Sequence, residues 1–83
     1  MKPGIAGSLS SCDCRVTIRP ASPTCIKIDS VVDAFFHNQI VAAAQKAIDQ
    51  SGAMGIEVII EDKGAFDYVI EARILTAIGR MKP

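Results

Sequence analysis

The segment from Ala6 to Cys14, AGSLSSCDC, concentrates side chains that could do chemistry. It holds three serines, two cysteines and one aspartate, and it has no basic residue. Four roles fit these residue types: a serine or cysteine nucleophile, a thiolate metal site, a pair of redox-active thiols, and a hydroxyl to which another enzyme attaches a group. The rest of the chain has to distinguish them.

A nucleophile needs a general base within hydrogen-bond reach and a group that orients this base. The sole histidine, His37, falls between Phe36 and Asn38 in a predicted helix, where we expect a partly exposed surface histidine. The chain also lacks the G-x-S-x-G turn of a nucleophile elbow. We therefore expect no catalytic residue, and a protein that is not an enzyme on its own.

The three cysteines, Cys12, Cys14 and Cys25, do not have the spacing of a typical metal site. Structural zinc sites usually pair C-x2-4-C elements, or combine cysteine with histidine. Cys14 alternates with apolar residues, so we expect it to face the core as a small hydrophobic residue. An odd number of cysteines also argues against a disulfide framework. We expect no metal ion.

A second polar cluster, EDKGAFD, runs from Glu61 to Asp67 at a predicted junction of strand and helix. Asp62 could cap the helix, and Gly64 could permit a tight turn. Alternatively, this surface is a binding site for a partner protein.

The length and charge of the chain limit its partners. It has 83 residues, which is one domain, and nine basic residues balance nine acidic ones. A neutral chain has no attraction to nucleic acid or to an anionic membrane surface. No apolar run approaches the roughly 20 residues of a membrane span, and the first residues lack a signal-peptide core. We expect a cytoplasmic protein with reduced thiols.

Hydrophobic periodicity predicts the order strand, strand, helix, strand, helix. Alternating residues indicate strands at 13–19 and 24–29, which a PASP turn would join as a hairpin, and a third strand at 55–62. Ser30, with Asp33 three residues on, would cap a first helix that ends near Gly52. A second helix spans 65–81.

We therefore predict a small α+β domain over residues 13–83, with a three-stranded sheet covered on one face by two helices. The open face of the sheet would carry Arg15, Thr17, Arg19 and Lys27. Residues 1–12, rich in glycine, proline and serine, would form a flexible arm.

Three segments in this order, AGSLSSCD, RVTIRP and VIIEDKGAFDYVIEARI, resemble the acyl carrier protein of citrate lyase, its gamma chain. The resemblance covers nearly the whole chain. It is most specific at seven positions: Asp62, Lys63, Gly64, Ala65, Asp67, Ala72 and Arg73.

The resemblance implies that a serine of the arm carries a covalent prosthetic group, phosphoribosyl dephospho-coenzyme A, through a phosphodiester. Aligning Asp13 with the aspartate of the family motif places the attachment at Ser11. The family usually has Glu where this chain has Ser10, and Gly where it has Cys12. Ser10 is therefore the alternative attachment site.

The family also implies the working partners. These are the alpha (transferase) and beta (lyase) subunits of citrate lyase, and the prosthetic-group transferase. The thiol of the group would hold acetyl and citryl thioesters while citrate is cleaved to acetate and oxaloacetate. As docking residues we predict Arg15, Arg19, Asp62, Lys63 and Asp67.

Other functions stay open from the sequence. The chain could be the carrier of a malonate decarboxylase or of a citramalate lyase. It could also be a binding module with an unmodified arm, or a thiol-based metal or redox protein.

Overall fold

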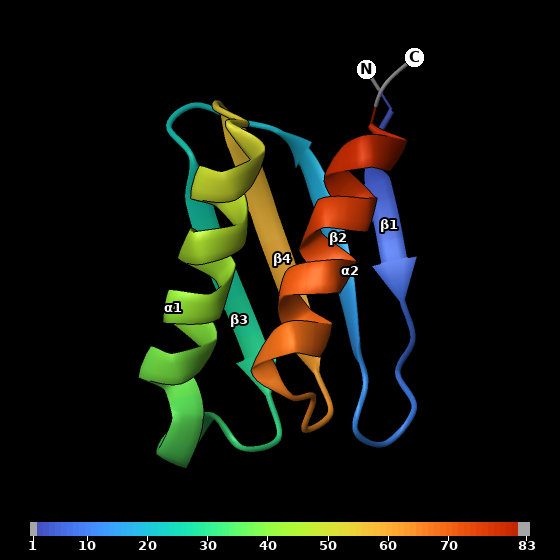
Figure 1. The fold of residues 1–83 in the computed structure, drawn as a ribbon, viewed down its shortest axis with the longest axis vertical. Helices are drawn as coiled ribbons and strands as arrows, with labels where there is room; N and C mark the ends of the chain where they lie inside the picture. The colour runs from blue at the N-terminus through green and yellow to red at the C-terminus, as the bar shows by residue number, and fades with distance from the viewer. Residues whose placement is uncertain (1, 82–83) are drawn as a thin grey trace.

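Two helices cover one face of a four-stranded sheet in the computed structural model, which describes residues 2–81 (Figure 1). The predicted α+β class and the placement of both helices on one face are therefore confirmed. The elements in chain order are β1 (Gly4–Gly7), β2 (Cys14–Pro20), β3 (Cys25–Ser30), α1 (Asp33–Ser51), β4 (Ile56–Asp62) and α2 (Asp67–Arg80). Met1 of the predicted arm and residues 82–83 of the predicted domain lie outside the described residues.

The strands lie in the order β1-β2-β4-β3, so the predicted hairpin of β2 and β3 is wrong. β4 lies between them, antiparallel to β2 and parallel to β3. None of its residues is exposed, unlike those of the other three strands, which suits a central position. The segment after β2 holds this arrangement, because the Ala21 amide donates to the Gly55 carbonyl at 2.9 Å and the Thr24 hydroxyl accepts from the Gly55 amide at 2.8 Å. These bonds tie the turn to the start of β4, and α1 provides the crossover between parallel β3 and β4.

The predicted strand count is also wrong, because Gly4–Gly7 pair with β2 as a fourth strand. This strand passes so close to α2 that a Cβ atom on Gly4 would lie 1.8 Å from the Ala77 carbonyl oxygen. Glycine is needed for this approach, although its presence suggested a flexible arm. Residues 4–7 of the predicted arm are thus part of the sheet, and the flexibility of the rest of the arm stays a prediction.

The core lies between the sheet and the helices. Alternate residues of β2 and β4 face the helices and are buried, as predicted, and both helices supply small or branched residues against them. The fully buried apolar side chains include Cys14, Val16, Ile18, Val58, Ile60, Ala44, Ile70 and Ile74. No helix within residues 2–81 is long and apolar enough to cross a bilayer.

The ends of α1 test the predicted caps. Gly52 ends the helix in the left-handed conformation at φ 72°, as predicted. Ser30 does not cap it, because the helix begins after Val32 without a side-chain cap. The Ser30 hydroxyl instead donates to Asp62 at 2.7 Å and accepts from the Val32 amide at 3.1 Å. The hydroxyl thus connects the end of β3 to the end of β4.

Candidate modification site

The predicted site lies in the loop Ser8–Asp13, which we call the serine loop. It connects β1 to β2 at the end of the domain that also holds the β3–α1 and β4–α2 connections (Figure 1). The Ser8 amide donates to the Cys14 carbonyl at 3.1 Å, and the Asp13 amide donates to the Ser10 carbonyl at 3.1 Å. These bonds shape the loop at its base and leave its tip projecting.

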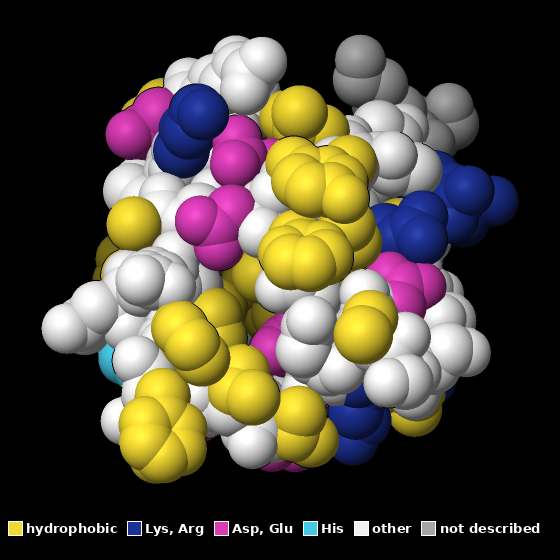
Figure 2. Space-filling view, turned by 60° about the horizontal axis from the view of Figure 1, so that its bottom comes forward, with side chains coloured by type: hydrophobic (Ala, Val, Ile, Leu, Met, Phe, Trp, Pro, Cys, Tyr) yellow, Lys and Arg dark blue, Asp and Glu magenta, His cyan; other side chains and the backbone are white. Residues whose placement is uncertain are grey.

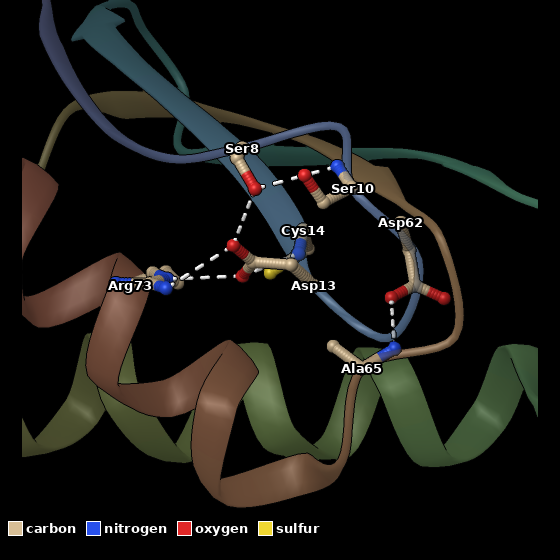
Figure 3. Close-up of polar contacts among 7 residues, drawn as sticks. All are labelled: Ser8, Ser10, Asp13, Cys14, Asp62, Ala65 and Arg73. Carbon is tan, nitrogen blue, oxygen red and sulfur yellow. Dashed lines mark hydrogen bonds and ion pairs between the residues drawn. The ribbon is translucent and has the colours of Figure 1, made fainter.

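Asp13 anchors one side of the serine loop (Figure 3). Its carboxylate accepts hydrogen bonds from the Ser8 hydroxyl at 2.6 Å, the Cys14 amide at 2.8 Å and both Nε and Nη2 of Arg73 at 3.1 Å. The Ser8 hydrogen bond first, and the Arg73 guanidinium second, lower the pKa of Asp13 to about 2. Asp13 is thus an ionised structural anchor and has little capacity to act as a base.

Main-chain bonds anchor the other side. The Cys12 amide donates to the Lys63 carbonyl, and the Lys63 amide donates to the Asp13 carbonyl, both at 2.9 Å. The serine loop is therefore joined directly to the turn between β4 and α2. In this way the two sequence motifs, far apart in the chain, form one local structure.

Ser11 and Ser10 lie at the exposed tip of the serine loop. Within residues 2–81, the Ser11 hydroxyl has one polar contact, with the Cys12 sulfur at 3.8 Å. His37 is occupied elsewhere, since it bonds to Asp33 at 2.7 Å on the surface of α1. The Ser11 hydroxyl is open to another enzyme, and the described chain offers it no base.

Cys12 has a positive φ of 64°, in the left-handed region. Glycine adopts this conformation without strain, whereas a residue with a Cβ atom is strained there. The glycine of the family pattern at this position is thereby explained: the residue after Ser11 must turn the chain back toward Asp13. This chain makes the same turn with cysteine.

The cysteines occupy three different environments. Cys12 is exposed, Cys25 lies on the outer face of the sheet 3.9 Å from a Glu57 oxygen, and Cys14 is buried. Burial, followed by the charges of Asp62 and Asp13, raises the pKa of Cys14 to about 12. Among the described residues, no three potential ligands come together as a metal site.

Asp62 lies inside the domain with only 1% of its surface exposed, so its predicted role in docking does not fit its position. It accepts from the Ser30 hydroxyl at 2.7 Å and from the Ala65 amide at 2.9 Å. Because α2 begins two residues after Ala65, Asp62 closes the preceding turn instead of capping the helix, as Figure 3 shows.

The other four predicted docking residues form two groups. Arg15 and Arg19 lie on the outer face of the sheet, where they pair with Glu61 and Glu57 at 2.9 Å. Lys63 and Asp67 are exposed at the two ends of the β4–α2 turn, and Lys63 is bonded to the serine loop. Lys63 is the member of the predicted set whose main chain is bonded to the serine loop.

An apolar groove near the serine loop was missed from the sequence. It encloses about 500 Å³ between the first part of α1 and the β4–α2 turn. Phe36 and Phe66 follow the predicted helical faces, yet both are exposed at the sides of this groove. Figure 2 shows the hydrophobic side chains around this hollow.

Comparisons with known proteins agree with this arrangement. The ACP family, described as the malonate decarboxylase delta subunit (MdcD), matches residues 1–81. The chain therefore belongs to this family of acyl carrier proteins, whose members hold acyl groups for other subunits and are not catalysts themselves.

The relatives specify the kind of carrier. The citrate lyase acyl carrier protein of Clostridium perfringens (strain 13 / Type A) is 40% identical over 81 residues, which cover 95% of this chain and 80% of that protein. Its counterpart in Haemophilus influenzae (strain PittEE) is 39% identical over 79 residues, with 95% and 83% covered. The resemblance inferred from the sequence is thus confirmed.

A solved structure shares the fold. In a Pseudomonas malonate decarboxylase hetero-tetramer in complex with malonate, one chain superimposes with a TM-score of 0.79 at 19% identity, covering 98% of this chain and 89% of that one. At this identity the likeness concerns the fold alone.

Proposed function

We propose that this protein is the acyl carrier subunit of a citrate lyase complex, with phosphoribosyl dephospho-coenzyme A attached to Ser11 through a phosphodiester. The observation that carries the proposal is the position of Ser11. Its hydroxyl is exposed at the tip of a loop that is anchored on both sides, by Asp13 to Arg73 and by Cys12 to Lys63. An attachment point that is accessible and also tied to a rigid body suits a carried group.

The residues around Ser11 fit such a group because the loop tip leaves space for it and its base stays fixed. The bound group supplies a terminal thiol that holds the acyl group as a thioester. Arg73 and Ser8 hold Asp13, and Asp13 holds the loop, so the tether starts from a defined place. The described residues offer Ser11 no base, so the activation of its hydroxyl belongs to the prosthetic-group transferase.

The proposed partners are the alpha subunit, which exchanges acyl groups, and the beta subunit, which cleaves citryl thioester to oxaloacetate and restores the acetyl form. Lys63 and Asp67 are the proposed docking residues at the β4–α2 turn, and Arg15 and Arg19 offer a second surface on the sheet. The unpaired cysteines support a reducing compartment, the cytoplasm.

A second candidate is the carrier of a malonate decarboxylase. The description of the matching family and the shared fold favour it. The identities of about 40% to citrate lyase carriers favour the first candidate. Binding to purified alpha subunits of each complex would separate the two.

The test is the intact mass of the chain after co-expression with its prosthetic-group transferase. We expect one cofactor adduct on the unaltered chain, the same adduct on Ser10→Ala, and no adduct on Ser11→Ala. Circular dichroism should show that both variants are folded. An adduct that persists in Ser11→Ala and disappears in Ser10→Ala would move the site to Ser10, and an unmodified chain would refute the proposed function.

A further inference from the structure

The groove beside the serine loop has the composition of a ligand site. Its base contains the buried Ile40, and aromatic rings form its sides, with Phe36 on α1 and the stacked rings of Phe66 and Tyr68 at the start of α2. The centroids of the stacked rings are 5.8 Å apart. A volume of about 500 Å³ falls within the range of about 300–1,000 Å³ that is usual for small-molecule sites.

The groove is joined to Ser11 by the main chain. Cys12, the residue after Ser11, donates its amide to the Lys63 carbonyl at 2.9 Å. Gly64 and Ala65, directly after Lys63, line the groove. A group attached to Ser11 therefore starts from a loop that is bonded to the border of the groove.

The charges at the groove indicate which part of a group attached to Ser11 could bind there. The described residues that line it include no basic group: they supply the carboxyls of Asp62 and Asp67, the Tyr68 phenol and the Gln39 amide. Asp62 already accepts hydrogen bonds from Ser30 and Ala65, so Asp67 is the carboxylate left to a ligand. Carboxylates repel phosphates and a citryl group, whereas they accept hydrogen bonds from amide N–H groups. Aromatic and aliphatic sides favour methylene and methyl groups. These features fit a neutral chain that contains amides.

We propose that this groove holds the neutral, amide-containing pantetheine segment of the group attached to Ser11 of the same molecule, while its phosphates remain in solvent. This inference rests on the proposed function. The groove shields the thiol end between transfers, and the docking of a catalytic subunit releases it.

The test compares the unmodified and the modified chain by ¹H–¹⁵N NMR, with the adduct verified by mass. We expect attachment at Ser11 to shift the amides of Gly64, Ala65 and Tyr68 in addition to those of the serine loop. In Phe66→Ser, the shifts at the groove should disappear while the adduct remains. The matched control is Phe35→Ser, which removes a side chain that is 84% exposed on the same end of the domain but does not line the groove.

A second measurement follows the accessibility of the thiol. Alkylation of the modified chain by iodoacetamide should be faster in Phe66→Ser than in Phe35→Ser, by about two- to tenfold if one aromatic wall contributes as much as an ordinary aromatic contact. Cys12 and Cys25 react in both variants, so the label on the prosthetic group is quantified by peptide mapping.

Three results would overturn the inference. The groove amides could stay unchanged on modification and shift only when a partner subunit is added, which would make the groove a protein-docking site. The groove amides could shift as the protein concentration rises, while sedimentation shows a dimer forming over the same range. That result would assign the groove to a second copy of the chain. The adduct itself could be absent, which would refute the proposed function and the inference with it.

Discussion

Replacement of Asp13 by asparagine tests the anchor of the serine loop, because it removes the charge and keeps the size. The pKa of Asp13 falls from 3.8 to about 2, and each unit corresponds to about 1.4 kcal/mol of differential stabilisation of the carboxylate. The side chains of Asp13 and Arg73 are 18% and 41% exposed, so solvent screening makes the contribution of this pKa shift to stability smaller. We expect Asp13→Asn to lower the free energy of unfolding by about 1–2 kcal/mol at neutral pH.

The lowered pKa of Asp13 also sets how the stability of the domain changes with pH. Since the pKa of Asp13 is lower in the folded state, its stabilisation is complete above about pH 4 and is lost as the pH falls toward 2. Urea unfolding followed by circular dichroism should therefore show a gap between the unaltered chain and Asp13→Asn that closes on acidification. Glu61→Gln is the matched control, because it breaks a similar bidentate pair that is more exposed, and it should cost about 0.5 kcal/mol or less. A gap that is absent at neutral pH, or that persists unchanged near pH 2, would refute the assignment of Asp13 as a charged anchor.

Three further predictions concern single residues. Gly4→Ala should destabilise the domain by about 3 kcal/mol in urea unfolding, because its Cβ atom would overlap the Ala77 carbonyl; an unchanged midpoint would contradict the close packing of β1 on α2. Cys12→Gly should raise the unfolding free energy by about 0.5–1 kcal/mol by relieving the positive φ, and a loss of stability would argue against that conformation. Cys14, with its pKa near 12, should resist iodoacetamide at pH 8 while Cys12 reacts, and peptide mapping that finds Cys14 labelled in the folded chain would exclude its burial.

The helices and three of the strands could be predicted from the sequence because their apolar residues keep a regular period. Val16 and Ile18 alternate along β2, and Ile70 and Ile74 recur on one face of α2; all four are fully buried. Local periodicity of this kind reports directly which side of an element faces the core.

The fourth strand and the strand order could not be predicted in this way. Gly4 and Gly7 are selected by the close approach of another part of the chain, and glycine carries no periodic signal. The hairpin of β2 and β3 was a reasonable local choice. It fails because long-range bonds from Ala21 and Thr24 to the start of β4 direct the chain away from β2.

The candidate site was only partly visible in the sequence. The family motif predicts Ser11 as the attachment site, with Ser10 as the alternative. The serine loop and the EDKGAFD motif are now seen to be bonded to each other. The sequence did not reveal that Arg73 anchors Asp13, because the two residues are 60 positions apart. The exposed aromatic rings of the groove were also missed, since an aromatic residue at helical spacing normally indicates a buried position.

The central claim is that one hydroxyl of the serine loop carries the prosthetic group through which the protein works. The most direct measurement is tandem mass spectrometry of peptides from the chain purified from its native host during acyl turnover. The account predicts the complete cofactor on Ser11, with an acyl group on its thiol. Unmodified Ser11 and Ser10 in a chain that still supports acyl turnover would contradict it.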